Sequence, residues 1–257
     1  MRLMIVRHGD PDYEHDTLTE RGWEEAKLLV PRFLKLDVKD FYVSPLGRAK
    51  DTASCTLKAL NRTAVECDWL REFPAELLVK DSESLQKGYP DTRKDENGFL
   101  PRITWDALPS YWTSRPEYFD RHEWRNSEVA AHSDMVECYD YVTGNFDRLL
   151  AEHGYVRCGN YYKAAEANRD ILVFFCHYGL ECVLLSHLMN VSPFVLWHGT
   201  VMTPTSVTTV FTEEREAGIA YFRARSIGDV SHLTAAGLEP SFSARFCETY
   251  DDWSERH

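Results

Sequence analysis

The 257-residue chain lacks the long apolar runs of about 20 residues that cross a bilayer. Its first apolar stretch, Leu3–Val6, is too short for the core of a signal peptide. Its seven cysteines include no CxxC pair, and several lie in apolar runs, which favours reduced, packed thiols. We therefore expect a cytoplasmic protein that does not associate with membranes.

A basic surface is also missing, because the formal net charge is −12. This charge argues against nucleic acid as a partner. An anionic substrate would have to be attracted by a few arginines focused in a pocket. The histidines show neither HxH nor HExxH spacing, so we expect no catalytic metal, and we expect no cofactor.

Short apolar runs alternate with longer helical patterns, which is typical of an α/β sheet protein. The expected strands are Leu3–Val6, Phe41–Val43, Ala64–Cys67 and Ile171–Cys176, followed by a hairpin of Ser206–Phe211 and Ile219–Ala224. The expected helices are Leu18–Leu36, one that begins with Ser44 as N-cap and Pro45 as N1, and the apolar stripes 136–150 and 180–188. The sequence predicts a three-layer α/β/α fold with a mixed, mainly parallel sheet.

Regular patterns fail between about residues 73 and 127, where glycine, proline and aromatic residues are frequent. A long irregular segment inside a compact protein is more often functional than a linker. We therefore expect a single domain over residues 1–257 with a cap inserted at about 74–135.

Three polar motifs each follow an expected strand directly: Arg7-His8-Gly9, Ser44 to Arg48, and His177-Tyr178-Gly179. Ligands of open α/β sheets bind at the carboxyl ends of the strands, and exposed helix N-termini there favour anions. If the strands are parallel, four side chains meet at one edge of the sheet and form an oxyanion pocket: Arg7, His8, Arg48 and His177.

The chemistry that suits this pocket is phosphoryl transfer. A neutral imidazole at His8 can attack phosphorus and leave again, and the cations Arg7 and Arg48 keep it neutral. The same arginines, with His177 as a further donor, compensate charge on the phosphoryl oxygens. The leaving oxygen needs a proton, for which Glu72 is the first candidate, Glu76 its competitor and Asp68 a weaker alternative.

These motifs, together with Leu18-Thr19-Glu20-Arg21-Gly22, resemble the histidine phosphatase (phosphoglycerate mutase-like) superfamily. The resemblance covers roughly residues 1–75 and 168–228. It implies a phosphohistidine at His8, an acid near Glu72, and a phosphate site made of Arg7, Arg48, His177 and Gly179. Mutases of this family follow the first motif with Glu-Ser and then Trp-Asn, whereas Asp10 to Glu14 stands here. The missing asparagine favours a phosphatase.

We therefore expect metal-independent hydrolysis of a small phosphomonoester, with a small phosphorylated metabolite as the partner. A phosphoglycerate or phosphosugar mutase, or a non-catalytic protein that binds a phosphorylated ligand, remain alternatives. The sequence identifies neither the substrate nor the oligomeric state, and a homo-oligomer stays open. Candidate substrate contacts are Asp10, Tyr13, Thr19, Arg102, Trp105, Tyr178 and Thr205.

Overall fold

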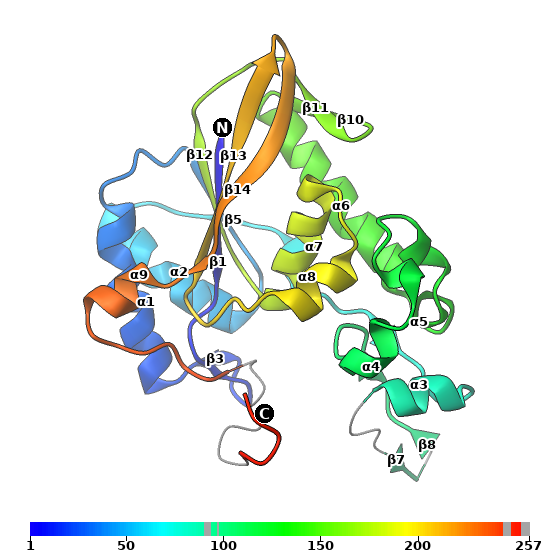
Figure 1. Ribbon diagram of the computed structural model, residues 1–257. Helices are drawn as coiled ribbons and strands as arrows, with labels where there is room; N and C mark the ends of the chain where they lie inside the picture. Colours follow the sequence, from blue (N-terminus) through cyan, green and yellow to red (C-terminus); the bar gives the residue numbers. More distant parts are fainter. Residues whose placement is uncertain (90–93, 97, 244–247, 253–257) are drawn as a thin grey trace.

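The computed structural model describes residues 1–89, 94–96, 98–243 and 248–252. Its centre is a sheet of eight strands in the order β10-β11-β14-β13-β1-β12-β4-β5 (Figure 1). Neighbouring strands are parallel from β1 (Arg2–Arg7) through β12 (Ile171–Cys176) and β4 (Asp40–Val43) to β5 (Val65–Glu66). The antiparallel part contains β13 (Val207–Glu216), β14 (Ile219–Asp229), β10 (Tyr155–Cys158) and β11 (Tyr161–Ala164).

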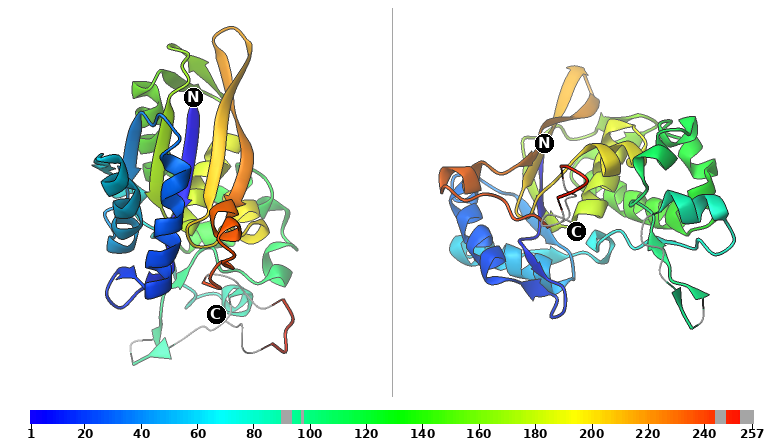
Figure 2. Two further views of the ribbon diagram at one scale, coloured as in Figure 1. Left: turned by 90° about the vertical axis from the view of Figure 1, so that its left-hand side faces the viewer. Right: turned by 60° about the horizontal axis from the view of Figure 1, so that its bottom comes forward.

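Helices cover both faces of this sheet (Figures 1 and 2). One layer holds α1 (Glu20–Phe33), α2 (Gly47–Leu60) and α9 (Ser231–Ala235), and the other holds α6 (Met135–Glu152), α7 (Tyr178–Met189) and α8 (Pro193–Gly199). Side chains alternate along β1, so Met4 and Val6 pack into the first layer while Leu3 and Ile5 pack into the second. The predicted three-layer α/β fold with a mixed sheet is confirmed.

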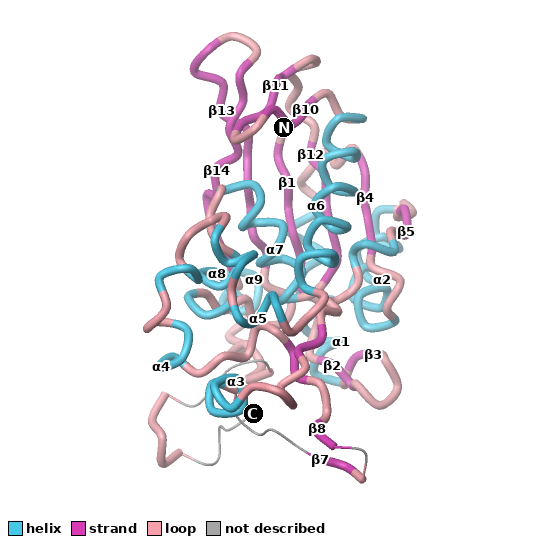
Figure 3. Tube along the Cα trace, turned by 90° about the vertical axis from the view of Figure 1, so that its right-hand side faces the viewer, coloured by secondary structure: helices cyan, strands magenta, loops and turns pink. Residues whose placement is uncertain are grey.

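The segment between β5 and α6 contains short elements only. They are η1 (Asp68–Leu70), β6 (Glu76–Leu77), α3 (Glu83–Gly88), β7 (Lys94–Asp95), β8 (Gly98–Phe99), β9 (Arg102–Ile103), α4 (Pro109–Trp112), η2 (Pro116–Tyr118), η3 (Glu123–Asn126) and α5 (Glu128–Ala131). Figure 3 shows α3, α4 and α5 beyond the ends of α6, α7 and α8. Fully buried Tyr89, Tyr118 and Trp124 give this segment aromatic packing that is continuous with the core.

Several predicted boundaries were wrong. Helix α1 is shorter than Leu18–Leu36 because Thr19 caps its start, and Pro31 neither breaks it nor ends it, since the helix continues to Phe33. Ser44 is not an N-cap: α2 begins at Gly47, and its N-cap Leu46 provides no side-chain hydrogen bond. The hairpin of β13 and β14 is confirmed and is longer than expected.

The sequence analysis missed the hairpin of β10 and β11 and the helices α8 and α9. Two further two-residue strands, β2 (Pro11–Asp12) and β3 (Thr17–Leu18), pair in the loop before α1. Within the described ranges, no helix has both the length and the apolar character required to cross a membrane.

Candidate active site

The three motifs lie at one edge of the sheet, because β1, β12 and β4 are parallel neighbours. Arg7 at the end of β1 aligns with Cys176 of β12, and Phe175 aligns with Val43 of β4. The next residues of each chain segment therefore emerge side by side. The ring centroids of His8 and His177, far apart in sequence, are 5.1 Å apart.

The imidazole of His8 has a defined tautomer. Its Nδ1 lies 2.7 Å from the carbonyl oxygen of Gly9, which can only accept a hydrogen bond, so Nδ1 carries the proton. In the neutral ring the lone pair then belongs to Nε2. Burial, with Arg7 next and Arg48 as a smaller cause, holds the pKa of His8 well below its ordinary value. His8 is therefore neutral near pH 7, with Nε2 able to act as a nucleophile.

His177 is the N-cap residue of α7 and is fully buried. Its Nε2 lies 2.8 Å from the hydroxyl oxygen of Ser44, and that oxygen accepts a hydrogen bond from the backbone N–H of Leu46 at 3.3 Å. Its Nδ1 is buried and has no hydrogen-bond partner among the described residues. Burial and the neighbouring His8 and arginines lower the pKa of His177, so this ring is neutral as well.

The two arginines have buried donors that the rest of the described chain leaves unpaired. Arg7 is 1% exposed, and its Nη1 donates to the carbonyl oxygen of Met202 at 2.6 Å. Arg48 donates from Nη1 to Asp16 Oδ1 at 2.6 Å. The Nε atom of each is buried without a partner. An unpaired buried donor costs about 1–3 kcal/mol, which an anion bound between these groups would recover.

Asp16 is a residue of this site that the sequence analysis did not identify. Its backbone is left-handed, with φ of 49°, and its Oδ2 accepts from the N–H of Gly47 at 2.7 Å. A side chain at Gly47 would lie 2.0 Å from the Asp16 carbonyl oxygen, so this contact requires glycine. Asp16 therefore anchors the loop after β1 to the first turn of α2 and orients Arg48.

Glu72 reaches the same edge through the first turn of α7. Its Oε1 accepts from the N–H of Leu180 at 3.0 Å and from that of Phe73 at 2.9 Å. Burial raises the pKa of Glu72, although these two hydrogen bonds and the arginines oppose the shift. A Cβ at Gly179 would be 2.9 Å from both Glu72 Oε1 and the indole of Trp105, so glycine allows this approach.

The competing carboxylates have other surroundings. Glu76 is exposed on β6, where its N–H donates to Asp134. Asp68 is exposed and pairs with Arg71 at 2.7 Å. Of the three acid candidates, Glu72 therefore has the contacts with α7 and the raised pKa that a general acid requires.

Three of the expected substrate contacts have partners within the chain. The Thr19 hydroxyl donates to Asp10 Oδ2 at 2.7 Å and accepts from Gly22 N–H, which caps α1. Arg102 pairs with Asp106 at 2.6 Å. The N–H of Thr205, whose φ is 56°, donates to the carbonyl oxygen of His8 at 3.1 Å. Thr205 thus supports the backbone of His8.

The remaining expected contacts are aromatic and border the arginines. The exposed ring of Tyr13 lies 5.4 Å from the guanidinium of Arg48, and the ring of Tyr178 lies 5.9 Å from that of Arg7. Tyr178 also donates its hydroxyl to the carbonyl oxygen of Trp197. The indole Nε1 of Trp105 is buried next to this site and has no partner in the described ranges.

A second carboxyl, Glu181, was also not predicted. It is fully buried on α7, and burial raises its pKa to about 8. Neither of its oxygens has a hydrogen-bond partner of good geometry in the part of the chain described. In the same part, no cluster of three or more His, Cys, Asp or Glu side chains could hold a metal ion.

Residues 3–101 match the model of the histidine phosphatase superfamily (branch 1). A 2,3-bisphosphoglycerate-dependent phosphoglycerate mutase from Thermoplasma acidophilum is 31% identical over 72 residues, which are 24% of this chain and 36% of that protein. This chain therefore aligns with about a third of the mutase.

Solved phosphatases have the same fold. A mutant phosphoserine phosphatase from Entamoeba histolytica in complex with phosphoserine has a TM-score of 0.55 at 15% identity, over 90% of this chain and 98% of that one. A mycobacterial glucosyl-3-phosphoglycerate phosphatase in complex with inorganic phosphate has a TM-score of 0.55 at 18% identity, again over 90% of this chain and 98% of that one. The alpha-ribazole phosphatase of Shigella flexneri has a TM-score of 0.52 at 17% identity, over 90% of this chain and 97% of that one.

Proposed function

The chain belongs to the histidine phosphatase superfamily, and from this membership we propose that it hydrolyses a small phosphomonoester through a phosphohistidine at His8, without a metal ion. The observation that carries the proposal is the state of His8. Its Nδ1–H is held by the Gly9 carbonyl, its ring is neutral, and two arginine side chains, each with a buried and unpaired Nε, lie beside it.

In the first step, the lone pair of His8 Nε2 attacks phosphorus, the N–P bond forms and the P–O bond to the leaving group breaks. Glu72, whose pKa is raised by burial, gives its proton to the leaving oxygen. The bound dianion raises that pKa further. Arg7, Arg48 and the Nδ1–H of His177 donate to the phosphoryl oxygens, and the Gly9 carbonyl stabilises the positive phosphoimidazole ring.

In the second step, water attacks phosphorus while the Glu72 carboxylate accepts its proton. The N–P bond breaks, and inorganic phosphate and neutral His8 are released. We assign the proton of neutral His177 to Nδ1, so that Nε2 accepts the hydroxyl hydrogen of Ser44, whose oxygen in turn accepts from the N–H of Leu46.

The buried, unpaired indole N–H of Trp105 suggests how the leaving group is held. A Cβ on Gly179 would meet both this indole and Glu72 Oε1, so the indole lies near the carboxyl that would protonate the leaving oxygen. We assign to Trp105 a hydrogen bond to the organic part of the substrate. Tyr13, exposed over Arg48, provides an aromatic surface at the entrance.

A mutase is the second candidate, because the curated relative is a phosphoglycerate mutase. Phosphatase activity is favoured because the loop after His8 has no counterpart of the mutase asparagine and because a carboxylate, Asp16, pairs with Nη1 of Arg48. A negative side chain there disfavours the second phosphate group of a bisphosphorylated intermediate.

The test is incubation with a panel of phosphomonoesters, with and without an acceptor sugar acid. We expect phosphate release that the acceptor and EDTA leave unchanged, and an acid-labile label on His8. Replacement of His8 by alanine should abolish turnover in a folded protein. Transfer faster than release would establish the mutase, and tight binding without turnover would establish a non-catalytic protein.

A further inference from the structure

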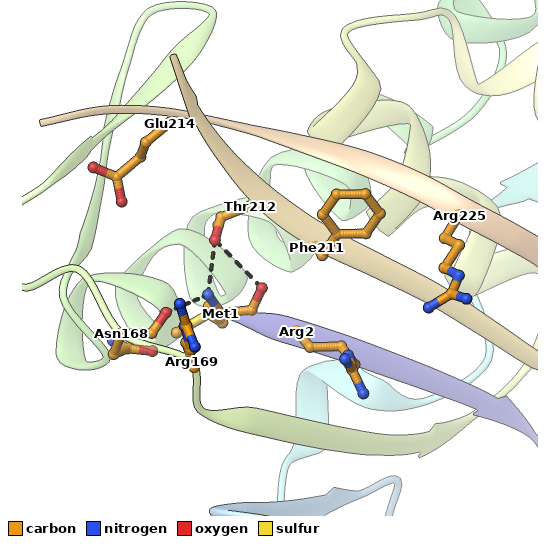
Figure 4. A pocket seen from close by; sticks show the side chains of 8 residues that line it. All are labelled: Met1, Arg2, Asn168, Arg169, Phe211, Thr212, Glu214 and Arg225. Atoms are coloured by element: carbon orange, nitrogen blue, oxygen red, sulfur yellow. Dashed lines mark hydrogen bonds between the residues drawn. The ribbon is translucent and has the colours of Figure 1, made fainter. Parts of the chain in front are cut away.

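A second group of basic side chains surrounds a pocket at the start of β1 (Figure 4). Arg2 is the first residue of this strand and His8 follows its last, so about six residue spacings of ~3.3 Å, or roughly 20 Å, separate them. The pocket has a volume of about 600 Å³, which is within the range of small-molecule sites. It is therefore separate from the candidate active site.

Three adjacent strands bring Arg2, Phe211 and Arg225 to this pocket. Met4 packs against α1 and α2, so by alternation Arg2 points to that face too, and Arg2 aligns with Phe211 of β13. On β14, Arg225 lies at the irregularity of the ladder opposite Thr209 and Val210, and it lines the same pocket as Arg2 (Figure 4). Arg169, from the segment before β12, completes the wall (Figure 4).

The three guanidinium groups of this pocket are unpaired. No described residue forms an ion pair or a hydrogen bond with the side chain of Arg2, Arg169 or Arg225. The neighbouring Arg223, also on β14, does pair, with Glu213 at 2.8 Å. Among the side chains that line the pocket, the three guanidinium groups and one carboxylate, Glu214, leave a net charge of +2. This concentration of positive charge stands in a chain whose net charge is −12.

We propose that this pocket binds a small molecule with two or more phosphate groups. Each guanidinium presents a planar fork of donors that matches phosphate oxygens, and three forks can engage more oxygens than a single carboxylate offers. The net charge of the wall suits a ligand with at least two negative charges. The ring of Phe211, on the strand between those of Arg2 and Arg225, offers apolar contact to the organic part (Figure 4).

The test is titration calorimetry with imidodiphosphate, whose P–N–P bridge resists hydrolysis. Because the active site also attracts phosphate, Arg48→Ala serves as the background. In that background, Arg169→Ala with Arg225→Ala should weaken binding roughly tenfold or more, as expected for the loss of charged hydrogen bonds. The control is Arg223→Ala. It also removes a guanidinium group from β14, but from outside the pocket, and should leave binding unchanged.

In the enzyme with Arg48 intact, Arg169→Ala with Arg225→Ala should leave kcat/KM for phosphomonoesters unchanged. Three results would overturn the proposal. The protein with both substitutions could bind imidodiphosphate as tightly as the Arg48→Ala background, or Arg223→Ala could weaken binding as much as the double substitution does. The third is a fall in kcat/KM for phosphomonoesters in the double variant with Arg48 intact. The binding readout does not depend on turnover, so failure of the proposed phosphatase activity would be seen separately.

Discussion

Replacing Glu181 with glutamine is expected to stabilise the protein progressively as pH rises. Burial raises the pKa of Glu181 to about 8 in the folded state, against an ordinary value of 4.5. Between these values the folded protein keeps a proton that the unfolded chain releases. Stability therefore falls as pH rises through this window and, for this group, is fully retained only below it. A glutamine side chain has the shape of the neutral carboxyl and does not titrate.

The size of the effect follows from linkage. One proton of difference changes the free energy of unfolding by about 1.4 kcal/mol per pH unit. Between pH 5 and pH 7, where the folded carboxyl stays protonated and the unfolded one is largely ionised, wild type should lose about 2.7 kcal/mol relative to Glu181→Gln. Above the pKa of Glu181 in the folded state, the free energies of unfolding of wild type and Glu181→Gln should change with pH at the same rate.

Urea denaturation at half-unit steps from pH 4.5 to pH 9 measures this difference. Glu24→Gln is the control for the substitution itself, because Glu24 is an exposed carboxylate on α1. A difference between Glu181→Gln and wild type that is independent of pH would refute the argument, since it would mean that Glu181 ionises in the folded protein as easily as in the unfolded chain.

Three further substitutions test the candidate site. Glu72→Gln should lower kcat/KM for alkyl phosphates by about 10²–10⁴-fold but affect p-nitrophenyl phosphate little, because nitrophenolate leaves without a proton; equal losses would contradict the role of acid. Gly179→Ala places a methyl group 2.9 Å from Glu72 Oε1 and should lower kcat in a folded protein, whereas Gly144→Ala, which meets no neighbouring atom, should not. Asp16→Ala removes the acceptor for Gly47 N–H and should cost about 1 kcal/mol of unfolding free energy in urea; an unchanged midpoint would refute the anchoring role.

The strands that position the candidate site could be predicted because buried parallel strands are continuous apolar runs. Leu3–Val6 and Ile171–Cys176 are such runs, and the second was predicted to the residue. The polar residues after them were then placed by topology alone. Edge strands such as Tyr155–Cys158 gave no comparable pattern, because Tyr155 is the one fully buried residue among its four.

Local patterns failed where a side chain serves a distant partner. Ser44 followed by proline has the form of a helix start, yet its hydroxyl bonds to His177, 133 positions away. Asp16 carries no local signal either, because its role depends on a left-handed backbone and on the approach of Gly47. Glu181 lies in a mostly apolar helix, and its position in the sequence did not indicate that its side chain is buried.

The neutral state of Glu181 explains how an acidic chain can attract an anion. Arg7 favours ionisation of this carboxyl, but the cost of burial exceeds that attraction and the pKa stays raised. An ionised Glu181 would compensate the guanidinium of Arg7 from within the core. Because Glu181 remains protonated near pH 7, the positive charge of Arg7 is available to the phosphoryl group of the proposed reaction, while the charge of Arg48 is partly compensated by Asp16. The same burial that destabilises the protein at alkaline pH therefore maintains the positive potential of the site.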